Sequence, residues 1–223
     1  MKLSENTVEI LKNFSTINQG LVVKPGSVLK TITPSRTVLA IARVVENFPV
    51  SFALYDLNKF LAKISLYKDA ELDFARDGIV IKSADGRRTD FIKYSSPEVV
   101  KGPPDKELEL PNPDYEFSLS LEDLIWQRKS AGVSGSENFV FRGDGKNIYI
   151  QSNTVKDDSS DLSSTKIGET DGVFSCVLQV SNFKLLDGSY DVKISKQGLT
   201  KFEHTSKEIE YYVAVESGLS EFE

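Results

Sequence analysis

Few side chains in this sequence could carry out catalysis. His204 is the only histidine, and it lies between Glu203 and Thr205 in a stretch that alternates like a β-strand. An imidazole could act as a general base, but the sequence marks no nucleophile near it. Cys176, the only cysteine, alternates with apolar residues and is predicted to be a core residue rather than a nucleophile. We therefore predict that the protein is not an enzyme.

Two further stretches resemble ligand-binding motifs without meeting their requirements. Asp157, Asp158 and Asp161 could bind a cation, but their spacing does not match an EF-hand loop. Residues 143–146, with the sequence Gly-Asp-Gly-Lys, lack the flanking residues of a phosphate-binding loop and lie between two predicted strands. We interpret residues 157–165, which include the three aspartates, as a solvated loop and residues 143–146 as a hairpin turn. The sequence thus predicts no metal site and no cofactor.

The predicted helices carry basic residues that could contact a polyanion. Lys59 and Lys63 are four residues apart, on the side of a helix opposite the apolar stripe of Leu57 and Leu61. The helices and their flanks hold eight basic and six acidic side chains, whereas the whole chain has a net charge of −6. A negative net charge argues against binding nucleic acid through the general protein surface. Either these basic faces are simply solvated, or they converge on a common axis that can accommodate DNA.

One arrangement recurs along the chain: an alternating strand leads directly into a helix. In residues 48–67, the alternation ends at Leu54, Asp56 follows, and helical spacing begins at Leu57. An aspartate is well suited to cap such a helix. Similar patterns occur in residues 115–132 with Asp123, in residues 173–186 with Asn182, and at the N-terminus with Glu5. The sequence therefore predicts four short helices, the last at residues 182–186.

The remaining apolar stretches are typical of strands linked by hairpins. Turn signals at residues 77–78, 85–86 and 143–145 separate alternating stretches. Residues 96–114 contain five of the eight prolines, and we interpret them as a connector between two compact halves. We predict an α+β fold with an N-terminal domain at 1–95 and a C-terminal domain at 115–223. Each domain is expected to pack two helices on one face of an antiparallel sheet.

Length and composition are ordinary for a globular protein. The chain has 223 residues, of which 39% are hydrophobic and 27% are charged. A single cysteine excludes an internal disulfide and favours a reducing compartment. The N-terminus lacks the apolar core of a signal peptide, and no stretch has the apolar length of a membrane span. We therefore expect no association with a membrane.

Several short sequences, taken in order, resemble the DNA sliding clamps of T-even-type phages, which are processivity factors of phage DNA polymerases. The matching stretches are MKLS at residues 1–4, LKNF at 11–14, YDLNKFL at 55–61, NFK at 182–184, GSY at 188–190 and KFE at 201–203. The resemblance runs from Met1 to about Glu216. These stretches have no chemistry of their own, so the specificity of the resemblance lies in their order and spacing.

The resemblance implies a homotrimeric ring with two similar clamp domains in each subunit. Helices would line a central hole, sheets would form the outside, and edge strands would pair between subunits. The implied function is in DNA replication: the ring encircles double-stranded DNA without sequence preference and tethers the DNA polymerase. A clamp-loader ATPase and late-transcription factors are further implied partners. The implied location is the cytoplasm of the infected host bacterium.

Two sets of site residues follow from the resemblance. The residues implied to face DNA, by their position on matching helices, are Lys12, Lys59, Lys63, Lys68, Arg128, Lys129 and Lys184. The candidate residues for a pocket that binds partner peptides near the connector are Val99, Val100, Leu108, Leu110 and Phe222. Glu5 and Glu9 make the first helix less positive than the resemblance implies, and the register of Arg128 against Lys129 toward DNA stays open. The alternative function is a structural β-rich interaction protein of a virion or tail.

Overall fold

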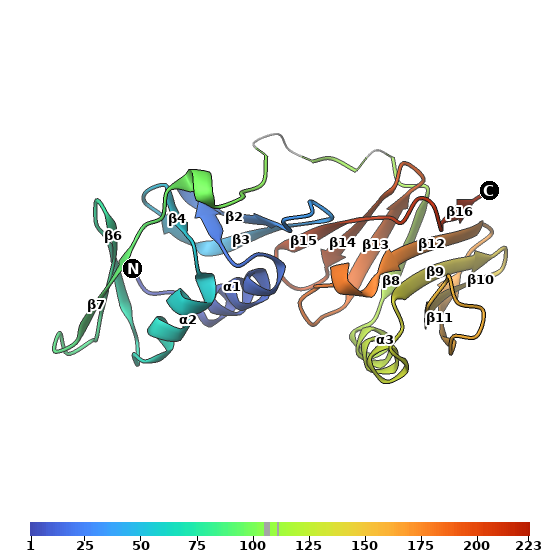
Figure 1. Ribbon diagram of the computed structural model, residues 1–223, viewed down its shortest axis with the longest axis horizontal. Helices are drawn as coiled ribbons and strands as arrows, with labels where there is room; N and C mark the ends of the chain where they lie inside the picture. Colours follow the sequence, from blue (N-terminus) through green and yellow to red (C-terminus); the bar gives the residue numbers. More distant parts are fainter. Residues whose placement is uncertain (105–107, 111) are drawn as a thin grey trace. The chain divides into compact units, whose positions relative to one another are not determined.

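The computed structural model describes residues 1–104, 108–110 and 112–223. The chain divides into two compact units, Met1–Lys106 and Glu107–Glu223, which we call unit 1 and unit 2 (Figure 1). The division falls inside the segment predicted to be a connector. The finer bounds at residues 95 and 115 stay predictions.

The described part of unit 1 combines two α-helices with seven strands (Figure 1). Its elements are α1 (Glu5–Ile17), β1 (Leu21–Val23), β2 (Gly26–Ile32), β3 (Val38–Phe48), β4 (Phe52–Leu54), α2 (Leu57–Ser65), β5 (Glu71–Phe74), β6 (Gly78–Lys82), β7 (Thr89–Lys93) and the 3₁₀ helix η1 (Pro97–Val99).

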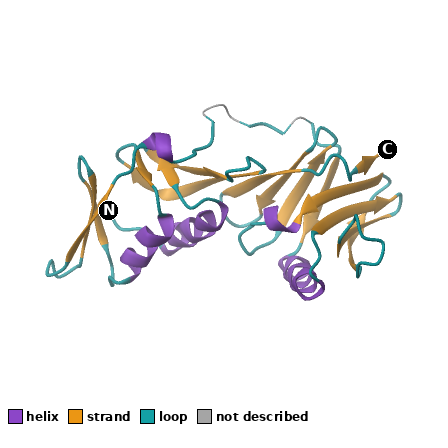
Figure 2. Ribbon diagram, viewed as in Figure 1, coloured by secondary structure: helices purple, strands orange, loops and turns teal. Residues whose placement is uncertain are grey.

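Unit 1 is held together by helices that pack on antiparallel strand pairs. Strand β2 pairs with β3, β1 pairs with β4, and β5, β6 and β7 form a three-stranded sheet in that order. Helix α1 packs on β2 and β3 and lies beside α2 (Figure 2). Ile10 and Phe14 of α1 and Leu57 of α2 are completely buried. Their helical spacing is the reason that these two segments fold as helices against the strands.

The described part of unit 2 has one α-helix and nine strands. Its elements are β8 (Tyr115–Leu119), α3 (Leu121–Ser134), β9 (Asn138–Asp144), β10 (Asn147–Asn153), β11 (Ser163–Glu169), β12 (Val173–Gln179), the 3₁₀ helix η2 (Val180–Asn182), β13 (Tyr190–Ser195), β14 (Leu199–His204), β15 (Ile209–Ala214) and β16 (Glu221–Phe222).

The strands of unit 2 form two antiparallel groups. The first has the order β11-β10-β9-β12-β16, and in the second β8, β13, β14 and β15 pair in that order. Helix α3 packs on β10 and β11. Aromatic rings fill the core: the ring of Phe202 lies 5.3 Å from that of Phe183 and 6.1 Å from that of Phe141. Such contacts bury a large apolar area, which stabilises the unit.

The structure confirms the predicted α+β class and most of the predicted elements. Ser4 caps α1 by accepting a hydrogen bond from the backbone N–H of Thr7, and Asp56 caps α2 by accepting one from Lys59. The hairpins predicted at Asp77, Asp85 and Gly143–Gly145 all join antiparallel neighbours. Local signals were sufficient in these places because capping and turn formation depend on adjacent residues.

The prediction of a fourth α-helix at residues 182–186 was wrong. The structure has only the short η2 there, and Phe183 at its end has φ −83° and ψ 56°, which is not helical. Five residues are too few to form a helix without strong tertiary support. In unit 2, therefore, an irregular segment occupies the place in the chain where a second helix was expected.

Three smaller predictions also need correction. The strand expected to begin at Phe48 begins at Phe52, after Pro49 has interrupted the pairing. Helix α3 is capped by Ser120 rather than Asp123, and it ends at Ser134, before the C-cap residue Gly135, whose φ of 64° is left-handed. The stretch 157–165, expected to be a solvated loop, ends in β11, whose serine and threonine residues gave no apolar alternation.

Candidate nucleic-acid and partner interfaces

The helices of unit 1 present basic side chains on their solvent-facing sides. Lys12 on α1 and Lys59 on α2 are exposed, and Lys68 is exposed in the turn that follows α2. The exposed face of α1 also carries Glu5 and Glu9. Since the two glutamates outnumber the single lysine on that face, α2 contributes most of the positive charge on the helices of unit 1.

Lys63 has a different environment from the other lysines of α2. Its ammonium group forms an ion pair with Asp90 of β7, and the hydroxyl of Tyr67 donates a hydrogen bond of 2.6 Å to the same carboxylate. The hydrogen bond from Lys63 and then that from Tyr67 lower the pKa of Asp90 below its ordinary value. Lys63 thus ties α2 to β7, and part of its charge is neutralised there.

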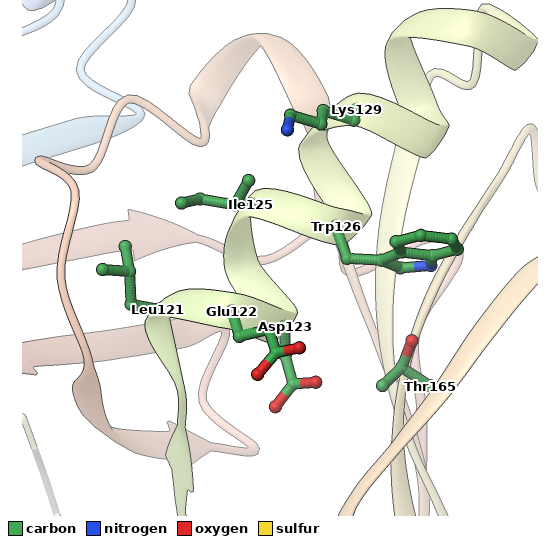
Figure 3. A pocket seen from close by; sticks show the side chains of 7 residues that line it. All are labelled: Leu121, Glu122, Asp123, Ile125, Trp126, Lys129 and Thr165. Atoms are coloured by element: carbon green, nitrogen blue, oxygen red, sulfur yellow. The ribbon is translucent and has the colours of Figure 1, made fainter.

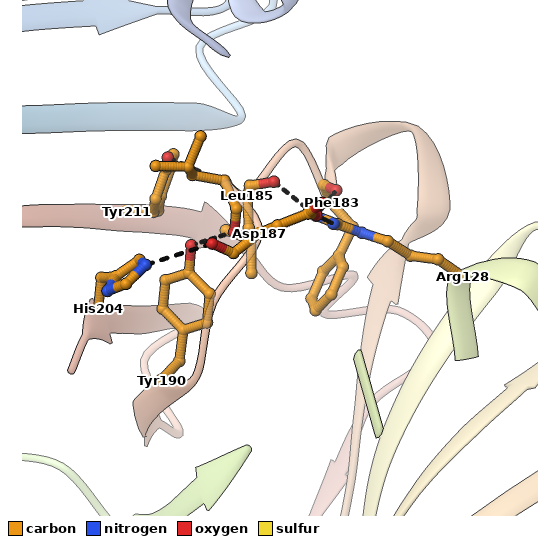
Figure 4. A network of polar contacts seen from close by, with 8 residues as sticks. Arg128, Phe183, Leu185, Asp187, Tyr190, His204 and Tyr211 are labelled. Carbon is orange, nitrogen blue, oxygen red and sulfur yellow. Dashed lines mark hydrogen bonds and ion pairs between the residues drawn. The ribbon is translucent and has the colours of Figure 1, made fainter. Parts of the chain in front are cut away.

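Arg128 on α3 is likewise engaged within its own unit. Its guanidinium group lies 2.7 Å from the carboxylate of Asp187 and donates a hydrogen bond of 2.6 Å to the carbonyl of Leu185 (Figure 4). A longer bond of 3.4 Å reaches the carbonyl of Phe183, whose ring also lies beneath the guanidinium group. Lys129, the next residue, is exposed. Of these two neighbours, Lys129 is therefore the one with its charge directed to solvent.

The segment 183–187 that binds Arg128 is fixed by a network of buried polar groups (Figure 4). Tyr190 donates a hydrogen bond to the carbonyl of Leu186, and Tyr211 accepts one of 3.1 Å from the N–H of the same residue. Burial raises the pKa of Tyr190 well above its ordinary value, so its hydroxyl stays protonated and can donate. Lys184 is half-buried in this segment rather than on a helix.

His204 belongs to the same network. Its Nδ1 accepts hydrogen bonds from the backbone N–H groups of Ser206 and Lys207, at 3.1 and 3.2 Å, and its Nε2 lies 3.4 Å from the carbonyl of Asp187. Both ring nitrogens are therefore occupied by backbone groups. A side chain on Gly188 would place its Cβ only 2.1 Å from Nε2, so the ring and the backbone are closely packed. The histidine therefore helps to position the segment.

A groove lies in unit 1, where the start of the connector passes over β1 and β2. Its lining residues are Val22, Lys24, Pro25, Val28, Lys30, Gly102, Pro103 and Pro104. The floor is largely apolar and two lysines contribute positive charge. Sequence reasoning missed this groove because its residues belong to segments separated by more than 70 positions.

The residues predicted to form a peptide pocket are divided between the two units. Val99 is 61% exposed, whereas Val100 is 6% exposed and packs near Gly20. Leu108, Leu110 and Phe222 belong to unit 2, where Phe222 pairs with Phe174 in the sheet. Whether they act together stays a prediction.

Each unit also ends one of its sheets with an exposed strand. Strand β7 is the last strand of the three-stranded sheet in unit 1, and its Phe91 is 52% exposed. Strand β11 is the last strand of the five-stranded sheet in unit 2. An edge strand offers unpaired backbone groups to another strand, so natural proteins usually cover it or use it for assembly.

Comparison with known proteins relates this arrangement to phage replication proteins. The sliding clamp of Enterobacteria phage T4 is 34% identical to the chain over an alignment of 228 positions, which covers 97% of each protein. Those of Escherichia phage RB69 and Vibrio phage KVP40 are 33% and 31% identical, and the matches again cover 97% of this chain. The chain belongs to the sliding clamp family. This membership confirms the resemblance stated from the sequence.

The fold of this sliding clamp is also found in solved structures of proliferating cell nuclear antigen, or PCNA. The PCNA of Entamoeba histolytica has a TM-score of 0.67 and 10% identity, with 94% of each chain covered. The structure of A. fulgidus PCNA with the C-terminal region of FEN-1 bound to it has a TM-score of 0.68 and 14% identity, with 96% of each chain covered. At these identities the likeness shows a shared fold. A search of protein-family models finds no match.

Three further observations complete the description of the clamp. Cys176 is completely buried, and burial raises the pKa of its thiol to about 12. The described residues contain no group of three or more His, Cys, Asp or Glu side chains placed to hold a metal ion. Helices long and apolar enough to span a membrane are likewise absent from the described part of the chain.

Proposed function

We propose that three copies of this chain form a closed ring that encircles duplex DNA and tethers the DNA polymerase during processive synthesis. The observation that carries this proposal is the 31–34% identity to three phage sliding clamps over nearly the whole chain. Such a ring holds DNA by topology, because leaving requires an opened interface or a DNA end. The protein then needs no catalytic group of its own and acts as a binding module.

The ring is closed by pairing β7 of one copy with β11 of the next. Both strands stand at the edge of a sheet, and they belong to different units. Pairing between different units is heterologous, and a heterologous contact generates a ring when its rotation closes. It would also hide both edges from other chains, which limits aggregation.

The exposed lysines of the helices supply the contacts to DNA. Lys12, Lys59, Lys68 and Lys129 present their charges to solvent, whereas Lys63, Arg128 and Lys184 are partly buried. Contacts between lysines and phosphates carry no sequence information, so they permit sliding along any duplex. A small number of such contacts keeps the barrier to sliding low.

Partner proteins bind the groove between residues 102–104 and β1–β2 through short peptides. The PCNA of A. fulgidus likewise binds the C-terminal region of another protein, FEN-1. In this chain, the apolar floor suits hydrophobic side chains, and Lys24 and Lys30 suit acidic neighbours. Its partners would include the DNA polymerase, a clamp-loader ATPase that opens the ring, and late-transcription factors. The place of action would be the host cytoplasm.

The assembly and the DNA contacts can be tested together. Light scattering should give a mass three times the 24.8 kDa of the chain. The double variant Lys12→Glu, Lys59→Glu should keep that mass but reduce processive synthesis on primed circular DNA, because it reverses two charges in the hole. A control, Lys146→Glu with Lys156→Glu, reverses two exposed charges in turns of unit 2 and should retain synthesis. A monomeric mass, or equal synthesis by both double variants, would contradict the proposal.

A further inference from the structure

The most exposed aromatic side chain of unit 2 lies in a groove on α3. Trp126 is the only tryptophan of the chain and is 61% exposed. The groove around it is lined by Leu121, Glu122, Asp123, Ile125, Lys129 and Thr165 (Figure 3). Large apolar groups exposed together on a surface commonly mark an interaction site.

This groove adjoins the edge strand β11. Figure 3 shows Trp126 on the side of α3 that faces Thr165 of β11. The buried side chain of Gln127 donates a hydrogen bond of 2.9 Å to the hydroxyl of Thr165, which fixes the helix to this strand. Arg128 reaches in another direction, toward residues 183–187. A strand that pairs with the edge of β11 would therefore bring the side chains on the α3 side of the sheet close to Trp126.

A complementary surface occurs in unit 1, where α2 meets β7. Lys63 and Tyr67 both bind Asp90, so the end of α2 is tied to β7. Leu66, between them in the sequence, is 72% exposed. When β7 of one copy pairs with β11 of the next, and α2 and α3 lie on the same side of the joined sheet, the end of α2 and the groove on α3 lie next to each other.

The charges of the two surfaces are also complementary. At the end of α2, Lys68 carries an exposed positive charge and residues 61–68 include no acidic residue, while Lys63 is paired with Asp90. The groove on α3 carries two carboxylates, from Glu122 and Asp123, against one lysine. Opposite charges at the margin of an interface favour the correct partner and orient it.

We propose that Trp126 anchors the contact between subunits, with the end of α2 of the next copy, at Leu66, seated in the groove on α3. This inference rests on the ring proposed above. Tryptophan is enriched among the few interface residues that carry most of the binding energy. The groove would thereby be filled by a second copy of this chain rather than by DNA or another protein.

The single tryptophan makes a direct test possible on the unmodified protein. Tryptophan emission and mass should be recorded together over a dilution series. The inference predicts emission at shorter wavelength in the assembled protein, because the indole is buried there, and a shift to longer wavelength as the ring dissociates. Emission that follows added duplex DNA but not protein concentration would assign the groove to DNA and overturn the inference.

Substitutions distinguish the role of Trp126 at the subunit contact from the formation of the ring itself. Trp126→Ala and Leu66→Ala should each raise the protein concentration needed for half-assembly by about ten-fold or more. The control Tyr55→Ala removes an aromatic side chain of 59% exposure that lies outside both surfaces, and it should leave assembly unchanged. If the wild-type protein never assembles, the proposed ring fails. If it assembles but both variants match the control, only the role of Trp126 fails.

Discussion

Helix α2 of unit 1 and the segment 183–187 of unit 2 follow similar strand patterns in the sequence, yet they fold differently. Helix α2 has a cap at Asp56 and an apolar stripe that includes Phe60 and Leu61, both buried against its own unit. The segment 183–187 has neither a cap nor a full helical turn, and side chains from α3, β13 and β15 hold it instead (Figure 4).

This difference shows two ways in which a segment that packs on a sheet can be held in one conformation. A helix satisfies most of its own backbone groups, so it needs only an apolar face and capped ends. An irregular segment leaves its backbone groups to be satisfied by other residues, and each buried group without a partner is costly. Unit 2 should therefore be more sensitive than unit 1 to the loss of single polar side chains.

The largest effect is expected for Arg128→Ala. This change removes the ion pair with Asp187 and leaves the carbonyl of Leu185 without its donor. The free energy of unfolding should fall by about 2–3 kcal/mol, because a hydrogen bond from a charged group is lost in a partly buried place. Urea unfolding at one fixed protein concentration would measure it, since assembly also affects stability.

Lys129→Ala is the matched control for that experiment. Lys129 is the neighbouring cation on the same helix and is exposed. Its removal should change the free energy of unfolding by less than about 0.5 kcal/mol. Equal losses in the two variants would show that Arg128 does not hold the segment.

A smaller effect is expected for Tyr190→Phe, which removes one hydroxyl from the network. The carbonyl of Leu186 then loses its buried donor, and the free energy of unfolding should fall by about 1–2 kcal/mol. Tyr55→Phe, at an exposed position, should have no measurable effect. If both substitutions were neutral in the same urea titration, the network would not be what stabilises the segment.

In unit 1, the corresponding change is the loss of a helix cap. Asp56→Ala removes the acceptor for the N–H of Lys59, and the free energy of unfolding should fall by about 1 kcal/mol. Asp56→Asn should restore most of it, because asparagine also caps well. A loss as large as that of Arg128→Ala would remove the proposed difference between the two units.

The smallest effect concerns pH and a carboxylate that joins α1 to β3. Glu46 accepts hydrogen bonds from Ser4 and Thr7; burial alone would raise its pKa, but these bonds lower it below the ordinary 4.5. A lowered pKa in the folded state stabilises the protein above pH 4.5, and that stabilisation is lost as the pH falls through the folded value. The free energy of unfolding, measured by urea titration at several pH values, should fall less steeply below pH 4.5 in Glu46→Gln than in the wild-type protein. If the two proteins showed the same dependence on pH, Glu46 would make no such contribution.

The sequence predicted those features of the fold that depend on neighbouring residues. Helices α1 and α2 were found from apolar spacing and capping residues, and the hairpins from their turn residues. In α3, Gln127 interrupts the apolar stripe, although it is buried and donates to Thr165. That partner is 38 positions away, so no local pattern reveals it.

The candidate site was predicted less completely than the fold. Lys12 was named from the resemblance, whereas Lys59 could be placed on the solvent-facing side of its helix from spacing alone. The engagement of Arg128 with residues more than 50 positions away could not, and neither could the binding of Lys63 to Asp90 on β7. In both cases the deciding contact is made across the fold, where the sequence carries no periodic signal.

The most direct test of the account is retention on DNA of two topologies. The clamp should be loaded onto primed circular DNA by a clamp-loader ATPase, and half of the sample should then be cut once to make the DNA linear. The bound clamp should persist on the circle and be lost rapidly from the linear molecule, because a ring without tight contacts slides off an end. Equal retention on both molecules would show that the protein grips DNA directly and would contradict the proposed ring.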